Sequence, residues 1–255
     1  DPIFDGQYSN RCYQDAVRQA FHNFSMKSEK QGRYNYEEDL RLTEQWSRII
    51  MHLPYAFQAK RMFPDIFRHD RQNTEYWESI SDQLGPMPAE HNSEDPLIIA
   101  IWEKAMDGYR RAISKTPEYL EFHASRIEKG QRASSLIGNQ YTGSIFLALM
   151  STFESDLEEN SNLDNALFGL CGYGSGAKAK VFEGKVSPRW REVVSRWHLF
   201  ERLGGRVAID HITYENLHKG LQDDSVVTPK SEFALVEIGD EGVDEGARRY
   251  KWVGA

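Results

Sequence analysis

Apolar side chains recur every three to four positions along much of the chain, and this spacing predicts amphipathic helices. The helices are expected at residues 10–27, 55–63, 96–114 and 141–157. Pro54 stands where a helix can begin, because the first helical turn needs no N–H group from that residue. Pro64 is expected to end the second helix.

Shorter apolar runs bounded by turn residues predict strands. They occupy residues 46–51, 165–172, 177–182, 233–238 and 248–253. Helices that alternate with apolar strands predict a fold of the α/β class. The polar residues 85–95 are expected to form a loop that belongs to an insertion, and they are less typical of a boundary between domains.

The charge balance argues against one class of function. The 255 residues include 31 Lys and Arg against 39 Asp and Glu, so the formal net charge is −8. A sequence-independent nucleic-acid binder needs a basic face to displace counterions, so we expect no nucleic-acid partner. The acidic residues 156–159 are expected to lie on the solvated surface.

No stretch of the chain predicts a membrane span or a secretion signal. The longest apolar runs fall short of the roughly 20 residues that cross a bilayer, so a cytoplasmic location is expected. The start at Asp1, without an initiator Met, is typical of the middle of a longer protein. Cys12 and Cys171 are too few for a disulfide framework or a thiolate zinc site, and each follows a core pattern. We therefore predict no metal.

His52 follows a predicted buried strand and precedes Pro54, so it should lie at the carboxyl end of that strand. Ligand clefts form at this edge of α/β sheets, and a histidine there could act as an acid, a base or a hydrogen-bond donor. The alternative is a partly buried histidine that bonds a local carbonyl group. Lys60 and Arg61 come shortly after and could meet a phosphate, although a solvated helix face is the simpler explanation.

Residues 138–144 (Gly-Asn-Gln-Tyr-Thr-Gly-Ser) stand directly before an apolar helix. Gly138 frees the backbone, and Thr142 or Ser144 could cap the helix. Asn139 would then project from a loop at the helix N-terminus, where its amide could donate to a carbonyl oxygen. Turn and capping chemistry alone also favours these residue types, and it is the alternative.

Residues 172–177 form a glycine-rich turn after a predicted strand. They imitate a dinucleotide-binding fingerprint, but a strand-like segment follows where that motif needs a helix. They also imitate a nucleophile elbow around Ser175, but Tyr173 and Ala177 stand where the elbow needs glycines. The backbone N–H groups and the Ser175 hydroxyl could still approach a ligand closely, and a structural turn is the alternative.

Four segments in order along the chain resemble hydroxymethylglutaryl-CoA synthase, a family of the thiolase superfamily. Residues 52–55 (His-Leu-Pro-Tyr) are similar to its His-x-Pro-Tyr/Phe motif, and residues 138–144 to its Gly-Asn-x-Tyr-Thr-[Ser/Gly]-Ser segment. Residues 173–176 resemble its Tyr-Gly-Ser-Gly turn, and residues 5–13 its Asp-Gly-x-x-Ser-x-x-Cys-Tyr element. The likeness runs from residue 2 to about residue 221, and residues 248–250 resemble the family's last strand.

The resemblance implies a fold, a reaction and its substrates. The fold would be the C-terminal half only of a thiolase-like layered α-β-α arrangement, formed by residues 1–255 with an insertion around residues 85–131. The family condenses acetyl-CoA with acetoacetyl-CoA to hydroxymethylglutaryl-CoA through an acyl-cysteine intermediate. CoA thioesters are its substrates, so no separate cofactor is expected, and a homo-oligomer is typical of the superfamily.

The resemblance also implies roles for individual residues. His52 would contact the acetoacetyl carbonyl and transfer a proton, and Asn139 would help to hold the acyl group. Attack on a ketone develops an oxyanion, which needs donors of this kind already in place. The other residues expected at the substrate are Pro54, Lys60, Arg61, Tyr141, Tyr173, Gly174 and Ser175.

The chain departs from the family in the residues that it lacks. The nucleophilic Cys and the general-base Glu belong to the half that would precede Asp1, so the chain is expected to need an N-terminal half as partner and to be inactive alone. Phe57 stands where many members carry a Lys near CoA. Two alternatives are a polyketide β-branching synthase that takes its acyl group from a carrier protein and a non-catalytic thiolase-like interaction subunit.

Overall fold

The structure is a computed structural model that describes residues 5–33, 41–174 and 176–254. The chain divides into two compact units, residues 1–203 and residues 204–255. Within the described ranges no helix combines the length and the apolar character that a membrane span requires.

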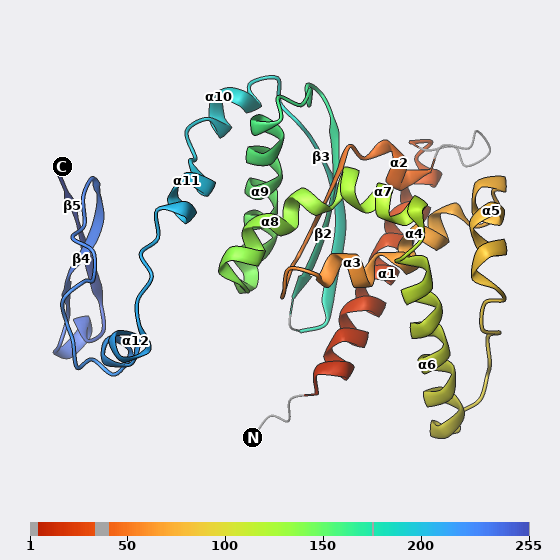
Figure 1. Cartoon of the computed structure of the whole chain (residues 1–255), viewed down its shortest axis with the longest axis horizontal. Helices are drawn as coiled ribbons and strands as arrows, with labels where there is room; N and C mark the ends of the chain where they lie inside the picture. Colours follow the sequence, from red (N-terminus) through yellow and green to blue (C-terminus); the bar gives the residue numbers. More distant parts are fainter. Residues whose placement is uncertain (1–4, 34–40, 175, 255) are drawn as a thin grey trace. The chain divides into compact units, whose positions relative to one another are not determined.

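The first unit contains a three-stranded sheet and most of the helices (Figure 1). Its strands are β1 (Arg48–Met51), β2 (Leu167–Gly174) and β3 (Lys178–Lys185). Its helices are α1 (Gly6–Lys30), α2 (Leu42–Gln45), α3 (Gln58–Met62), α4 (Pro64–Arg71), α5 (Glu75–Leu84), α6 (Pro96–Ile113), α7 (Pro117–Arg126), α8 (Glu128–Ile137), the 3₁₀ helix η2 (Tyr141–Gly143), α9 (Ser144–Glu158), α10 (Trp190–Val194) and α11 (Leu199–Gly204), the last ending where the second unit begins.

The order of the strands brings two strand ends together. The sheet runs β1-β2-β3, with β1 parallel to β2 and β2 antiparallel to β3. Met51, the last residue of β1, lies opposite Cys171 of β2. Parallel strands end at the same edge of a sheet, so the residue that follows β1 lies beside the last residues of β2.

Helices cover both faces of this sheet. Phe168 and Tyr173 of β2 are five positions apart, and successive side chains of a strand alternate between its faces, so these two rings lie on opposite faces. Tyr173 contacts Tyr13 of α1, with 4.6 Å between the ring centroids, and Phe168 stacks on Phe153 of α9 at 5.1 Å. The arrangement is therefore the layered α-β-α fold that the family resemblance implies.

The second unit consists of α12 (His211–His218), β4 (Glu232–Ile238), the 3₁₀ helix η3 (Gly242–Asp244) and β5 (Arg248–Val253). β4 and β5 pair antiparallel, with Glu232 opposite Val253 and a bulge near Leu235. The side chain of Asp210 caps α12 by accepting a hydrogen bond from the Thr213 N–H group, 2.7 Å away.

The expected helices appear as α1, α3, α6 and α9, and the five expected strands appear as β1 to β5. Pro64 is expected only to end the helix before it. It also begins α4, because its fixed φ suits the first turn of a helix. Helices α4, α5, α7 and α8 lie where apolar periodicity predicts none. The buried face of α8 shows why, since it consists of Gly130, Gln131, Ala133 and Ser134.

The prediction that residues 156–159 lie on the solvated surface is confirmed for Glu158 and Glu159 but is wrong for Asp156. Asp156 is fully buried instead of solvated, and it accepts a hydrogen bond from Arg48 Nε at 2.8 Å and another from Lys129. Burial opposes its negative charge, but the hydrogen bonds from Arg48 and Lys129 outweigh that cost and hold the pKa of Asp156 below its usual value. The ion cluster ties α8 and α9 to the beginning of β1.

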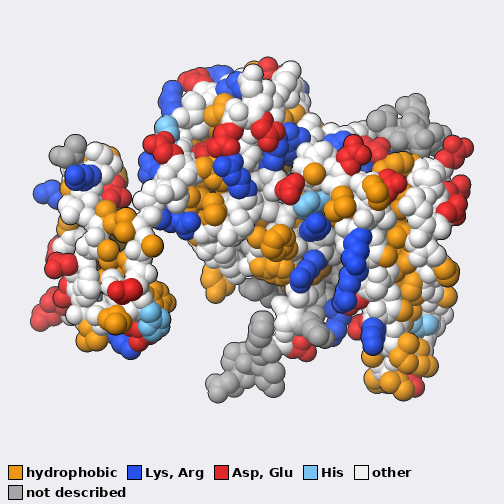
Figure 2. All heavy atoms as spheres, in the orientation of Figure 1, with side chains coloured by type: hydrophobic (Ala, Val, Ile, Leu, Met, Phe, Trp, Pro, Cys, Tyr) orange, Lys and Arg blue, Asp and Glu red, His pale blue; other side chains and the backbone are white. Residues whose placement is uncertain are grey.

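The beginning of α6 carries apolar side chains that the first unit does not bury. Leu97 and Ile101, one helical turn apart, are 68% and 62% exposed. Figure 2 shows apolar surface gathered over this end of α6. The beginning of α6 thus presents an exposed apolar surface.

Candidate active site

His52 is the first residue after β1, and it is held from two sides. Its backbone N–H group donates to the Cys171 carbonyl of β2 at 3.0 Å, which extends the parallel pairing by one residue. Its carbonyl oxygen accepts a hydrogen bond from the Tyr13 hydroxyl of α1 at 2.7 Å. The histidine therefore occupies the carboxyl end of the strand, as the sequence predicts.

The surroundings of the His52 ring keep the imidazole neutral near pH 7. The residue is 8% exposed, and burial lowers the pKa of its imidazole from the ordinary value. Its ring centroid lies 6.2 Å from that of Tyr173 and 6.4 Å from that of Tyr13. A neutral imidazole can accept a proton at one nitrogen while it donates from the other, which is what proton transfer at an acyl group requires.

The glycine-rich turn lies beside His52. Tyr173 and Gly174 are the last residues of β2, and β3 follows after the turn, so the segment lacks the helix that a dinucleotide-binding fingerprint needs. Burial raises the pKa of the Tyr173 hydroxyl, which stays protonated as a donor. Ser175, predicted to line the acyl pocket, lies outside the described residues.

Asn139 lies in the turn between α8 and α9, and its acceptor atom is occupied. Its Oδ1 accepts hydrogen bonds from the Tyr141 N–H group at 2.7 Å and from the Ser144 hydroxyl at 3.2 Å. The carbonyl side of the amide therefore faces the turn, and the Nδ2 hydrogens remain to donate to another group. The role that the resemblance implies for Asn139 at the acyl group stays a prediction.

The same turn contains two unusual backbone conformations. Gly138, which ends α8, has a φ of 89°, and Tyr141 has a φ of 46° although it carries a large side chain. A tyrosine in the left-handed region is strained, and such strain persists where surrounding contacts impose it. The Tyr141 side chain is 78% exposed, so it extends away from the core.

The α8–α9 turn and the β2 turn lie on the same side of the sheet. Figure 1 shows that α9 begins at the edge where β1 and β2 end. A side chain added at Gly172 would stand 3.8 Å from Ile145 Cδ1, so the beginning of α9 contacts β2 one residue before Tyr173. His52 and Tyr173 thus meet directly, and the first turn of α9, which follows the Asn139 turn, borders the end of β2.

The remaining predicted residues lie on the segment that follows His52. Pro54 is half-buried two positions later, and Lys60 and Arg61 belong to α3. The Lys60 carbonyl accepts a hydrogen bond from the Tyr119 hydroxyl at 3.0 Å. Burial lowers the pKa of His123, and the charge of Lys60 adds to this lowering. Arg61 lies over the Tyr55 ring at 5.8 Å. The structure therefore brings neither cation into contact with His52 or Asn139.

Cys171 does not have the environment of a nucleophile. Cys171 is fully buried in β2, and burial raises the pKa of its thiol to about 12, so it carries no thiolate near neutral pH. Cys12 lies partly buried in α1. Among the described residues no cluster of three or more His, Cys, Asp or Glu could hold a metal ion.

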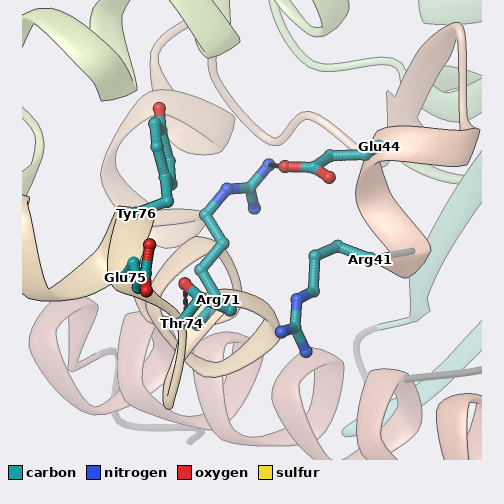
Figure 3. A pocket seen from close by; sticks show the side chains of 6 residues that line it. All are labelled: Arg41, Glu44, Arg71, Thr74, Glu75 and Tyr76. Atoms are coloured by element: carbon teal, nitrogen blue, oxygen red, sulfur yellow. Dashed lines mark hydrogen bonds and ion pairs between the residues drawn. The ribbon is translucent and has the colours of Figure 1, made fainter. Parts of the chain in front are cut away.

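A cavity of about 310 Å³ lies elsewhere in the first unit (Figure 3). It is lined by Arg41, Glu44, Arg71, Thr74, Glu75 and Tyr76, none of which the sequence predicts at the site. Arg71 is buried, pairs with Glu44 at 3.1 Å and stacks on Phe67 at 4.1 Å. Its charge is therefore compensated within the protein, so this cavity adds no residue to the candidate site.

The residue that sequence reasoning missed is Tyr13. It belongs to a motif of the family resemblance, but its place on the apolar face of α1 predicts only a core residue. The sequence feature that distinguishes Tyr13 from an ordinary core residue is its hydroxyl, because a buried Tyr O–H group needs a hydrogen-bond acceptor. That acceptor is the His52 carbonyl.

Known proteins with similar sequences are hydroxymethylglutaryl-CoA synthases. The enzyme of Haloferax volcanii is 25% identical over 258 aligned positions, which cover 99% of this chain and 54% of the relative. The enzyme of Schizosaccharomyces pombe is 26% identical over 262 positions, which cover 97% of this chain and 54% of the relative. The chain thus spans about half the length of the curated relatives that it matches.

Solved structures of synthases share the fold. MvaS in complex with 3-hydroxy-3-methylglutaryl coenzyme A aligns with a TM-score of 0.70 at 24% identity, over 98% of this chain and 52% of MvaS. The HMG synthase of the curacin pathway, in complex with its holo donor carrier protein, aligns with a TM-score of 0.63 at 17% identity, over 98% and 51%. At these identities the likeness concerns the fold, which is that of the C-terminal half of an HMG synthase.

The motifs, the fold and the sequence comparison therefore agree. Residues 1–233 match the family described as hydroxymethylglutaryl-coenzyme A synthase C terminal, which is more than half of the chain. The chain belongs to the C-terminal family of the hydroxymethylglutaryl-CoA synthases.

Proposed function

We propose that this chain supplies the His52 and Asn139 side of the acyl site of a hydroxymethylglutaryl-CoA synthase, which condenses acetyl-CoA with acetoacetyl-CoA. The observation that carries the proposal is the meeting of the His52 and Tyr173 rings, 6.2 Å apart, at the sheet edge where α9 begins. Two segments of the family resemblance, about 120 positions apart in the chain, converge there.

The chemistry follows from the state of each group. The neutral His52 imidazole would donate a hydrogen bond to the ketone of acetoacetyl-CoA and so stabilise the oxygen that becomes negative on attack. When it passes that proton to the oxygen from one ring nitrogen, it would take up a proton at the other, so that the imidazole stays neutral. The Asn139 amide would donate from Nδ2, because its oxygen is occupied within its own turn. Both donors would be in place before the reaction, so little reorganisation would accompany the development of charge.

The nucleophile would come from residues outside this chain. Acyl transfer needs a thiolate that takes the acetyl group and a base that removes a proton from its methyl carbon. Cys171 is buried and protonated, so it cannot serve as this thiolate. We therefore expect activity only in the presence of a segment that carries the family's nucleophilic Cys and general-base Glu.

Reconstitution tests the proposal. The chain is mixed with the matching N-terminal half, and condensation is followed by the release of free CoA. We expect activity that His52→Ala lowers by roughly 10²- to 10⁴-fold. His69→Ala is the matched control, because burial also lowers the pKa of this histidine but it faces His22 instead of the candidate site.

The outcome of the His52 variant decides the role of the chain. Full activity of His52→Ala in an active mixture would contradict the proposal and favour a non-catalytic interaction subunit. The chain alone, assayed in parallel, should release no CoA. Size-exclusion chromatography with light scattering of the active mixture should report a homo-oligomer of the complete enzyme.

One residue favours a second substrate source for the same chemistry. Phe57, 63% exposed before α3, stands where the family resemblance implies a Lys near CoA. Without that cation the acyl group could arrive on a carrier protein, as in a polyketide β-branching synthase. Acetoacetyl-CoA and acetoacetyl carrier protein are therefore assayed side by side, and the higher kcat/KM identifies the carrier of the acetoacetyl group.

A further inference from the structure

Tyr13 is the buried group at the candidate site to which the proposed reaction assigns no role. It is 2% exposed, and its hydroxyl bonds the carbonyl of His52, 39 positions away. Burial, together with Cys171 and Tyr173, raises the pKa of this hydroxyl well above its ordinary value. The group is therefore a permanent neutral donor at the pH of catalysis.

The place of this bond in the sheet gives it a specific function. β1 ends at Met51, and His52 keeps one backbone bond of the ladder, through its N–H group. The hydrogen bond to its carbonyl comes from a side chain of α1. A strand end held in this way depends on the helix above it as well as on the neighbouring strand.

The aromatic contacts also indicate that α1 holds the end of β1. The Tyr13 ring lies 4.6 Å from Tyr173 and 6.4 Å from His52, while His52 and Tyr173 lie 6.2 Å apart. The three rings form a triangle in which each contacts the other two. Tyr13 thus contacts the backbone of His52 and also the ring beside it.

We propose that Tyr13 is a positioning residue, whose hydroxyl bond to the His52 carbonyl fixes the imidazole at the end of β1 and keeps it away from water. The proposal rests on the proposed function of His52 for its catalytic meaning, but the position of the imidazole can be measured without any turnover. Among the described residues, the rings that contact His52 are the uncharged phenols of Tyr13 and Tyr173.

The test compares two phenylalanine variants in the complete 255-residue chain. Tyr13→Phe removes one hydroxyl and keeps the ring. Tyr119→Phe is the matched control, since Tyr119 is also fully buried, and its hydroxyl also donates to a backbone carbonyl, that of Lys60 at 3.0 Å. The readout is the His52 imidazole titration, followed by NMR and assigned with His52→Asn.

We expect Tyr13→Phe to raise the His52 pKa by about half a unit or more, because a loosened strand end admits water to the ring. Tyr119→Phe should leave the His52 titration in place. No shift in Tyr13→Phe, or the same shift in both variants, overturns the proposal, because a general loss of stability would then explain the result.

The reconstituted enzyme supplies the catalytic readout. The acid limb of the kcat/KM profile should move to higher pH in Tyr13→Phe, and its plateau should fall about 10- to 100-fold. If His52→Ala keeps full activity, the proposed function fails, while the NMR titration still decides whether Tyr13 positions the imidazole. If His52→Ala is inactive and the Tyr13→Phe profile does not move, the positioning role alone is wrong.

A second change keeps the test decisive if Tyr13→Phe does not fold. Site-specific 3-fluorotyrosine at position 13 preserves the hydroxyl and makes it a stronger donor. The carbonyl carbon resonance of His52 should then shift, whereas 3-fluorotyrosine at position 119 should shift that of Lys60 and leave His52 unchanged. An unchanged His52 carbonyl signal with the label at position 13 overturns the proposal.

Discussion

The two candidate catalytic side chains are held in place by different means. His52 depends on residues far away in the sequence, since its backbone bonds reach Cys171 and Tyr13. Asn139 depends on its neighbours, because its side-chain oxygen bonds Tyr141 and Ser144, two and five positions later. His52 is buried, and Asn139 is exposed.

This difference teaches which parts of the site need the whole fold. The position of His52 exists only when α1, β1 and β2 are assembled, so it should be lost together with global stability. The Asn139 turn closes its own hydrogen bonds, so it should tolerate damage to the sheet. Substitutions that destabilise the sheet should therefore change the position of His52 while the conformation of the Asn139 turn stays the same.

The largest effect is expected from Asp156→Ala. The substitution removes a buried carboxylate and leaves Arg48, at the start of β1, without its partner, which should cost about 3–5 kcal/mol in the free energy of unfolding. Urea denaturation measures this loss. Glu158→Ala is the control, because Glu158 and its partner Arg132 are both exposed, and it should cost less than about 1 kcal/mol.

The Asp156 carboxylate should also make the free energy of unfolding depend on pH. The folded-state pKa of Asp156 is lowered, so its contribution is fully present above the unfolded value of about 3.9 and is lost as the pH falls through the folded pKa. The difference in unfolding free energy between the wild type and Asp156→Asn should therefore narrow below about pH 4. A difference that stays constant down to the acid transition would contradict this origin.

The next largest effect is expected from Gly169→Ala. An added Cβ would lie 2.1 Å from the buried Trp46 ring, so the ring or β2 must move, at a cost of about 3 kcal/mol or more. Gly169 lies two residues before Cys171, the backbone partner of His52, so the His52 NMR signal should change while that of Asn139 persists.

A second glycine of the same sheet serves as the control for Gly169. In Gly184→Ala the added Cβ would meet Leu170 Cδ1 at 3.6 Å, an ordinary contact distance, and the stability should change by less than about 1 kcal/mol. Equal losses in the two variants would show that the Trp46 contact is not the cause.

The same comparison explains how far the sequence predicts the molecule. The Asn139 turn and the strand before His52 follow local rules, so their places could be predicted from residue spacing and turn chemistry. The Tyr13 bond and the burial of Asp156 could not, because each pairs residues that only the folded chain brings together. Helices α4 and α8 could not be predicted for a related reason. They bury polar or small residues, and a pattern of apolar positions assigns such residues to the exposed face.

A smaller, local effect is expected from Ser144→Ala. The Ser144 hydroxyl is fully buried, accepts from the Gln140 N–H group at 3.0 Å and donates to Asn139 Oδ1. Its loss should cost about 1–2 kcal/mol and increase the mobility of the Asn139 side-chain amide in ¹⁵N relaxation. The His52 titration should not change. Thr142→Ala, at an exposed position of the same turn, should cost less than about 0.5 kcal/mol.

The smallest effect is expected from thiol alkylation. It tests whether the sheet stays closed to solvent beside His52, at the end of β1. Cys171 carries the carbonyl that binds the His52 N–H group, and burial raises its thiol pKa to about 12, so the folded chain should not react there with iodoacetamide at pH 8. In Cys12→Ser, labelling of Cys171 then requires opening of the sheet, and its rate should rise in parallel with the loss of stability in Gly169→Ala. Fast labelling of Cys171 in the stable chain would mean that the His52 end of β1 opens without global unfolding. The position of His52 would then not depend on the whole fold, and the contrast with the Asn139 turn would disappear.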